Sequence, residues 1–289
     1  MVGPTAAGKT RLGLEAARAT GATILSVDSM QVYRGMDIGT AKATAVERAE
    51  VEHLMIDLVE PEVDFTVAEF QQVARGEIDS RSEPILIVGG SGLHFRAVVD
   101  PLEFPPHDSA LRAGLDAQPA ESLVAELTAA DPEAARWVDL DNPRRVSRAV
   151  EILRLTGATP SARGESEHAA HVREYRSLFP LDVFGVDPGD EIGAMVDARV
   201  AEMRRAGLLE EVASLAGRLG RQAAQAVGYR QLLGVVAGEV SEEEGFAAVA
   251  SATRALVKRQ RTYFGRDPRI QWMDADTVGS ALVKALEVG

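Results

Sequence analysis

The chain has 289 residues, 46% of them hydrophobic, so it can bury a sizeable core as one large domain or as a main domain with an insertion. It contains no cysteine, which excludes disulfides, a cysteine nucleophile and a thiolate-bound zinc ion. A net charge of −13 argues against a polyanionic partner on average, but affinity for nucleic acid depends on where Lys and Arg cluster.

The chain opens on a phosphate-binding pattern, G-x-x-x-x-G-K-[ST]. The residues that match it are Gly3, Pro4, Thr5, Ala6, Ala7, Gly8, Lys9 and Thr10. The glycines let backbone N–H groups converge on an anion, Lys9 neutralises phosphate charge, and the Thr10 hydroxyl can ligate a Mg²⁺ that bridges phosphate oxygens. The loop predicts binding of a phosphate chain, as in ATP-binding and other nucleotide-binding proteins, and leaves the compound open.

The residues before the loop and the rest of the chain allow two further statements. No signal peptide precedes it and no apolar run approaches the ~20 residues that span a bilayer, so we expect a cytoplasmic protein with no membrane partner. A phosphate loop normally follows a buried strand, yet only Met1 and Val2 precede Gly3. The strand that should present the loop is therefore almost absent.

Short, continuous apolar runs further along predict strands that are buried on both faces of a sheet. These runs cover residues 23–27, 85–88, 183–186 and 270–273. Helical apolar spacing lies between them, over 11–19, over 68–78 and on both sides of Gly207. We therefore predict an α/β fold of the phosphate-loop type, with a mainly parallel sheet flanked by helices.

A small helical insertion domain is predicted over residues 106–141, where the composition turns rich in Ala, Leu and Glu without a strand signal. Residues 1–105 and 142–289 then form the core domain, although the C-terminal edge of the insertion is left open. Residues 156–173 carry Gly157, Pro160 and Gly164 among polar residues, which predicts a mobile loop.

Two polar residues follow predicted strands. Ligands of an open parallel sheet bind beyond the carboxyl ends of its strands, so we expect Asp28 to face the phosphate site. Asp28 could hold Mg²⁺ through water, act as a general base, or only cap a helix. Ser91, in the turn 89–92, could touch a leaving group or a reacting base, or belong to a simple Gly-rich turn.

Several segments, in the expected order, make the chain resemble the tRNA dimethylallyltransferase family. They are residues 3–10, 28–42, 88–93, 142–152, 199–208, 227–231 and 253–260, so the resemblance covers nearly the whole chain. Two positions depart from the family: Ser91 stands where Thr is usual, and His94 where Tyr is usual. The serine keeps the hydroxyl, whereas any role at the position of His94 stays open.

The resemblance implies transfer of a dimethylallyl group from dimethylallyl diphosphate to N6 of adenosine 37 in tRNA, which releases diphosphate and gives N6-dimethylallyladenosine. Asp28 is then the general base, because the adenine amine must lose a proton as it attacks. Lys9, the loop amides, Mg²⁺ at Thr10 and Arg199 would stabilise the charge on the departing diphosphate, with Ser91 as a further catalytic group.

Contacts with the tRNA anticodon stem-loop are predicted from the same resemblance. Asp28, Ser29, Met30 and Gln31 match the segment that contacts the target nucleotides, and Gln31 could bond an adenine edge. The other predicted contacts are Ser91, Arg112, Arg144, Arg145, Arg148, Arg230, Lys258 and Arg261. Arg144 and Arg148 share one helix face, as do Lys258 and Arg261, which by itself would also suit a solvated charged face.

Three other functions share parts of this pattern. A phosphate-loop kinase of small molecules would need a lid with catalytic arginines, and a transferase acting on free adenine nucleotides would not need the insertion or the basic helices. A non-catalytic RNA-binding protein would not need Lys9, Thr10 and Asp28. We therefore favour the tRNA transferase, and expect a monomer with Mg²⁺ as its cofactor.

Overall fold

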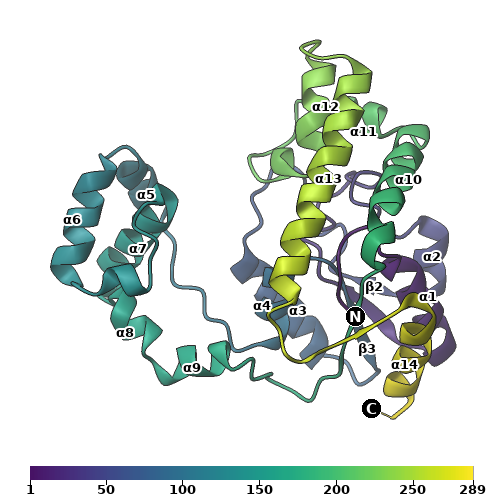
Figure 1. The fold of residues 1–289 in the computed structure, drawn as a ribbon, viewed down its shortest axis with the longest axis horizontal. Helices are drawn as coiled ribbons and strands as arrows, with labels where there is room; N and C mark the ends of the chain where they lie inside the picture. Colours follow the sequence, from purple (N-terminus) through teal and green to yellow (C-terminus); the bar gives the residue numbers. More distant parts are fainter. Residues whose placement is uncertain (289) are drawn as a thin grey trace. The chain divides into compact units, whose positions relative to one another are not determined.

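The structure, a computed structural model, describes residues 1–288, and the contacts divide the chain into two compact units (Figure 1). The first unit comprises residues 1–99 and the chain from 179 onward, and the second comprises residues 100–178. A separate cluster of buried hydrophobic side chains forms the core of each unit.

The strands of the first unit pair in parallel. In one sheet β1 (Thr23–Ser26) lies between β2 (His53–Leu54) and β3 (Ile85–Val88). In the other, β4 (Val183–Val186) pairs with β5 (Ile270–Met273). The strands predicted from the apolar runs are confirmed, whereas the short β2 carried no signal that we recognised.

Val2 lies directly before the phosphate loop and pairs as a strand residue would. It forms parallel bridges both to Gly89, directly after β3, and to Gly185 in β4. Its N–H donates to the carbonyl of Phe184 at 2.9 Å, and its own carbonyl accepts from the N–H of Val186 at 3.0 Å. Val2 therefore joins the two sheets, and it brings the phosphate loop to the carboxyl ends of β1 and β3.

Helices surround these strands in the first unit. They are α1 (Lys9–Thr20), α2 (Ala45–Glu50), α3 (Val67–Asp79), α4 (Gly92–Val99), α10 (Ile192–Arg205), α11 (Leu208–Leu215), α12 (Tyr229–Val236), α13 (Glu242–Phe264) and α14 (Ala275–Val288). α1 packs against α14, and α13 packs against both α10 and α12. None of the helices described within residues 1–288 combines the length and the apolar character that a bilayer crossing requires.

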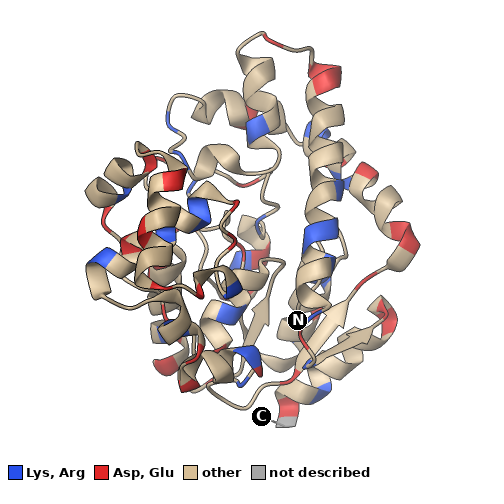
Figure 2. Cartoon of the chain, turned by 60° about the vertical axis from the view of Figure 1, so that its left-hand side comes forward, with Lys and Arg blue, Asp and Glu red and all other residues tan. Residues whose placement is uncertain are grey.

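The long helix α13 begins with a capping box. The Ser241 hydroxyl accepts from the N–H of Glu244, and the Glu244 carboxylate accepts from the N–H of Ser241 at 2.9 Å. Three glutamates in the first turn also interact favourably with the positive end of the helix dipole. The opposite charge, on Lys and Arg, is carried further along the helix (Figure 2).

The second unit is helical, as predicted for the insertion, but it is larger than residues 106–141. Its helices are α5 (Ser109–Asp116), α6 (Ala120–Ala130), α7 (Pro143–Thr156), α8 (Pro160–Gly164) and α9 (Glu167–Arg173). α7 buries Val146 and Val150 against Leu115 and Leu127, so its apolar face belongs to the core of this unit. The unit therefore covers residues 100–178, and the residues from 142 onward do not return at once to the main domain.

Residues 156–173 were predicted as a mobile loop, and the loop assignment is wrong, because α8 and α9 lie within this range. Thr159 and Ser166 cap α8 and α9, each through a side chain that accepts a backbone N–H of the helix. The buried carboxylate of Asp131 accepts from both the N–H and the hydroxyl of Ser161 at 2.8 Å. Caps and a buried carboxylate thus order a segment that its glycines and polar residues mark as irregular.

Candidate active site

The phosphate loop turns sharply before α1. Ala6 and Gly8 have positive φ angles of 66° and 80°, so successive backbone groups reverse direction there. Gly3 approaches β4 so closely that a Cβ would lie 2.2 Å from the carbonyl oxygen of Val186. The first N–H groups of α1 have no carbonyl partner within the helix and form an anion-binding end.

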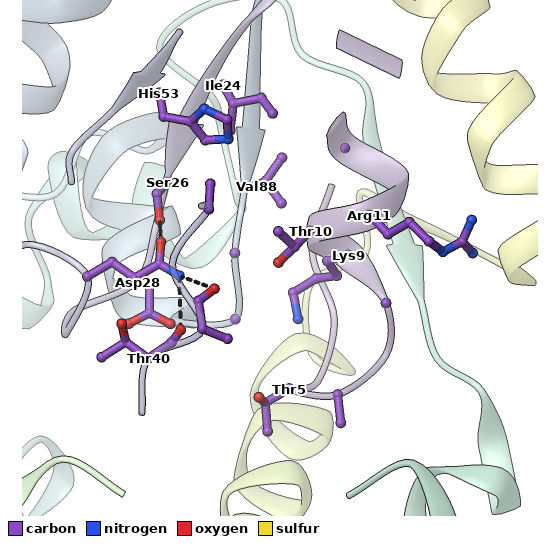
Figure 3. A pocket seen from close by; sticks show the side chains of 18 of the residues that line it. Thr5, Lys9, Thr10, Arg11, Ile24, Ser26, Asp28, Thr40, His53 and Val88 are labelled. Carbon is purple, nitrogen blue, oxygen red and sulfur yellow. Dashed lines mark hydrogen bonds between the residues drawn. The ribbon is translucent and has the colours of Figure 1, made fainter. Parts of the chain in front are cut away.

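A cavity of about 310 Å³ opens at this loop (Figure 3). Lys9 and Thr10 line it from the start of α1, and Asp28 lies across from them in the segment after β1. Arg11 points away from this space (Figure 3). Arg199 of α10 also lines it, so three of the four predicted catalytic residues, Lys9, Asp28 and Arg199, lie around one cavity although they come from distant parts of the chain.

A second cavity, of about 280 Å³, adjoins the first. Both are lined by Thr5, Asp28, Thr40, Gly90, Arg199 and Gln260. The second cavity is also lined by Ser29, Met30 and Ser91, which were predicted to contact the acceptor. Asp28 therefore borders both the cavity that contains Lys9 and Thr10 and the adjoining cavity that contains Ser29, Met30 and Ser91.

The first cavity holds two cations in a buried setting. The Lys9 ammonium donates to the carbonyl of Pro4 at 2.6 Å. Burial, and then the charge of Arg199, lower the pKa of Lys9 to about 7, while the charge of Asp28 acts in the opposite sense. Burial also lowers the pKa of Arg199. An anion bound between them would relieve this unfavourable arrangement.

Ser91 and His94 form a pair at the start of α4. The Ser91 hydroxyl lies 2.7 Å from His94 Nδ1, and the imidazole stands edge-on to the ring of Phe70 at 4.7 Å between centroids. Burial lowers the pKa of His94, while the charge of Asp28 opposes that shift. The imidazole is therefore neutral near pH 7, and it orients the Ser91 hydroxyl.

Gln260 of α13 is a site residue that the sequence reasoning did not single out. Its Oε1 accepts from the N–H of Thr5 at 2.8 Å, and its Nε2 donates to the carbonyl of Gly90 at 2.9 Å. One amide thus ties the phosphate loop to the turn that follows β3. The sequence signal that could have identified Gln260 is that it is a neutral amide among the basic residues of α13.

Gln31 has partners within the protein. Its Oε1 accepts from the Ser26 hydroxyl at 2.7 Å, and its Nε2 donates to the carbonyls of Thr40 at 3.1 Å and Ala41 at 3.4 Å (Figure 3). These bonds hold the segment after β1 in place. The expectation that Gln31 bonds an adenine edge stays a prediction.

The predicted tRNA contacts of the first unit differ in their surroundings. Arg230 and Lys258 are exposed. Arg261 is held by an ion pair with Asp187, in which Nε donates to Oδ2 at 2.7 Å. Lys258 and Arg230 are therefore the side chains of this set that are best placed to meet an external phosphate.

In the second unit, two predicted contacts surround the buried carboxylate of Glu151. Arg148 donates to Glu151 at 2.8 Å and to the carbonyl of Pro105 at 2.8 Å, and Arg112 donates to Glu151 at 3.4 Å. Arg144 and Arg145 are exposed, and Arg145 pairs with Asp139. The structure thus gives Arg112 and Arg148 a role inside their own unit.

Mg²⁺ was predicted at Thr10. Among residues 1–288, no three His, Cys, Asp or Glu side chains are grouped so as to hold a metal ion. The Thr10 hydroxyl and the Asp28 carboxylate are nevertheless oxygen donors that line the same cavity. Mg²⁺ usually keeps several waters and binds through one or two protein oxygens plus substrate phosphates. The donor set therefore fits a Mg²⁺ ion that is held largely by a bound diphosphate.

The chain is similar to several known proteins over most of its length. A tRNA dimethylallyltransferase of Bifidobacterium adolescentis is 40% identical over 288 residues, which are 95% of this chain and 83% of the relative. The solved structure of a tRNA isopentenylpyrophosphate transferase from Bacillus halodurans is 34% identical, with a TM-score of 0.69 over 99% of this chain and 95% of that one.

Two further matches concern the fold and the family. The structure of a eukaryotic dimethylallyltransferase acting on tRNA has a TM-score of 0.76 over 99% of this chain and 76% of that one; at 20% identity this is a likeness of fold. The family model described as IPP transferase matches residues 31–267. The chain therefore belongs to the IPP transferase family, the family of the tRNA dimethylallyltransferases.

Proposed function

We propose that this protein transfers the dimethylallyl group from dimethylallyl diphosphate to N6 of adenosine 37 in tRNA, with release of diphosphate. The observation that carries the proposal is the position of Asp28 between two adjoining cavities. A transfer reaction needs the leaving group and the acceptor on opposite sides of one carbon. The cavity at the phosphate loop suits the diphosphate, and the second cavity suits the adenine.

On the donor side, the breaking carbon–oxygen bond leaves negative charge on diphosphate. Lys9, Arg199 and the N–H groups at the start of α1 are already in place to receive that charge. Because they are buried, they interact with it more strongly than they would in water. Mg²⁺, when bound at Thr10, would supply further positive charge at the phosphate oxygens.

On the acceptor side, N6 bonds to the allylic carbon and loses one proton. Asp28 lies at the border of the two cavities and is the group that takes this proton. One of its oxygens, Oδ1, accepts from the N–H of Met30 at 2.8 Å, which fixes the direction of the carboxylate. The Ser91 hydroxyl, held by His94, lies in the same cavity and would contact the reacting groups.

The target base must leave its stack to reach this cavity, as in other enzymes that modify bases. The exposed cations Arg144, Arg145, Arg230 and Lys258 would bind the phosphates of the anticodon stem-loop. We further propose that the protein acts as a monomer, in the cytoplasm where tRNA is found.

The test is incubation of the protein with radiolabelled dimethylallyl diphosphate, Mg²⁺ and an unmodified stem-loop that carries adenosines at positions 36 to 38. ATP and AMP serve as alternative acceptors. Label in the RNA that disappears when adenosine 37 is replaced supports the proposal. Label in the free nucleotide alone would assign the protein to adenylate prenylation, and absence of label from every acceptor would contradict both.

Asp28→Asn tests the general base. The amide keeps the size of the side chain and cannot accept the proton, so we expect single-turnover transfer to slow by about a thousandfold. Stem-loop affinity, measured by fluorescence anisotropy, should change by less than about threefold, since one hydrogen bond contributes modestly. An equal loss of affinity and of turnover would contradict the general-base assignment.

A further inference from the structure

Two backbone segments from distant parts of the chain each form a wall of the second cavity. Gly39 and Thr40 belong to the segment after β1, and Val227 and Gly228 precede α12. Glu211 of α11 is not among the described residues that line either cavity. It nevertheless bonds to both segments.

The Glu211 carboxylate accepts hydrogen bonds from consecutive backbone N–H groups. Oε2 accepts from Asp37 at 3.0 Å and from Ile38 at 2.8 Å, and Oε1 accepts from Gly39 at 3.1 Å. Successive N–H groups that converge on one carboxylate form a small anion-binding nest. Hydrogen bonds to an ionised acceptor are roughly twice as strong as neutral ones, so Glu211 fixes this segment firmly.

The same carboxylate holds the other wall. The Tyr229 hydroxyl donates to Glu211 Oε1 at 2.5 Å. Burial, and then the charge of Glu211, raise the pKa of Tyr229, so this hydroxyl keeps its proton and remains a donor. Tyr229 directly follows Gly228, which means that its position sets the position of that wall.

Packing prevents the two walls from approaching further. A Cβ on Gly39 would lie 2.4 Å from Cε2 of the Tyr229 ring, so the ring already rests on the backbone of this glycine. The ring therefore sets the shortest separation between the walls, and the Glu211 carboxylate prevents a longer one.

We propose that Glu211 is a positioning residue that sets the width of the acceptor cavity, and thereby its preference for adenosine over a bulkier base. The inference rests on the proposed function, because it takes the second cavity as the site of the tRNA base. Glu211 acts through the backbone of Gly39 and the hydroxyl of Tyr229, without touching the base.

The test uses Glu211→Gln, which preserves the shape of the side chain. The amide oxygen can replace one carboxylate oxygen, but the NH₂ group must take the place of the other. There it faces either the N–H groups of Asp37 and Ile38 or the N–H of Gly39, and two donors that face each other cannot form a hydrogen bond. We expect kcat/KM for an adenosine stem-loop to fall about tenfold, the effect of losing one or two charge-assisted bonds. KM for dimethylallyl diphosphate should stay within about twofold, because neither Glu211 nor the residues that bond to it line the first cavity.

The diagnostic readout is discrimination between bases. A second stem-loop carries N6-methyladenosine at the target position; this base keeps one N6 hydrogen and adds one methyl group. A cavity of fixed width should give a kcat/KM for the methylated stem-loop that is about tenfold or more below the kcat/KM for the adenosine stem-loop. In Glu211→Gln the ratio of these two kcat/KM values, the discrimination ratio, should shrink toward one. Glu210→Gln, an exposed neighbour on the same helix, is the matched control and should retain the ratio of the unaltered protein.

Tyr229→Phe gives an independent reading should Glu211→Gln fail to fold. The ring that rests on Gly39 remains, and one bond to Glu211 is lost. We expect Tyr229→Phe to reduce the discrimination ratio by less than Glu211→Gln does. The double variant should reduce it by less than the two single variants together, because both changes remove the same contact.

The inference is overturned if either variant leaves the discrimination ratio unchanged while KM for dimethylallyl diphosphate rises with loss of thermal stability. That result would give Glu211 a purely structural role. If the unaltered protein labels neither stem-loop, the proposed function fails and this inference fails with it. If the unaltered protein is active and Glu211→Gln equals it in every readout, the inference alone fails.

Discussion

Lys9 shows how the setting of one residue can tune phosphate binding. It is 9% exposed, bonds to the carbonyl of Pro4 and lies near Arg199. Its pKa of about 7 is well below the ordinary 10.5, so in the free protein much of Lys9 is neutral above pH 7. A bound diphosphate favours the charged form and must raise this pKa. Binding above pH 7 should therefore take up a proton.

We expect that proton uptake to be measurable with inorganic diphosphate as the ligand. Titration calorimetry at pH 8 in buffers of different ionisation enthalpy should show about one more proton taken up by the unaltered protein than by Lys9→Met. The difference should vanish below pH 6, where free Lys9 already carries its proton. Protons taken up or released by diphosphate itself contribute to both measurements, so subtracting the value for Lys9→Met cancels them. Equal uptake by both proteins at pH 8 would contradict the lowered pKa.

Among the elements, α7 of the second unit is organised around one buried charge. Glu151 is fully buried and accepts from Arg148, from the N–H of Asp108 and from His107. Burial alone would raise the pKa of Glu151, but these hydrogen bonds outweigh it and lower the pKa to about 2. The carboxylate thereby joins α7 to the segment that leads into α5.

The lowered pKa of Glu151 fixes the sign of a pH effect. Its stabilising contribution is complete above the ordinary value of 4.5 and is lost as the pH falls from 4.5 toward 2. The protection factors of α7 amides, which are their exchange rates corrected for the intrinsic pH dependence of exchange, should therefore fall over that interval by more than those of α1. Glu151→Gln should accelerate exchange at α7 already at pH 7, because Arg148 loses its charged partner. A variant with unchanged exchange at pH 7 would show that the network does not stabilise this unit.

For the whole molecule, net charge and RNA binding have to be reconciled. The chain carries −13 overall, yet exposed basic residues such as Lys258 occur on helices that also bear buried apolar faces. Phosphate binding depends on local cations, because each neutralised phosphate releases counterions. Strong salt dependence is therefore expected despite the acidic total.

Stem-loop affinity measured between about 50 and 200 mM salt tests this expectation. Lys258→Ala should weaken binding and reduce the slope of log K against log salt by roughly 0.7–0.9, the value of one phosphate contact. Lys284→Ala, an exposed lysine on α14, is the matched control and should leave the slope unchanged. Equal slopes for all three proteins would remove Lys258 from the RNA interface.

The sequence by itself determined the features that local pattern encodes. Short, continuous apolar runs predicted β1 and β3, because a strand buried on both faces needs mostly apolar side chains. The phosphate loop, Asp28 and the family resemblance followed from residues that are adjacent in the chain. Each of these signals lies within a short segment.

Only the tertiary structure decided how distant segments meet. Gln260 bonds to Thr5 across 255 residues, and Glu211 bonds to Gly39 across 172. Val2 pairs as a strand residue because β3 and β4 approach it from both sides, and α7 belongs to the second unit because its apolar face packs there. A single polar or apolar residue is compatible with many partners, and the packing of the whole chain selects one of them.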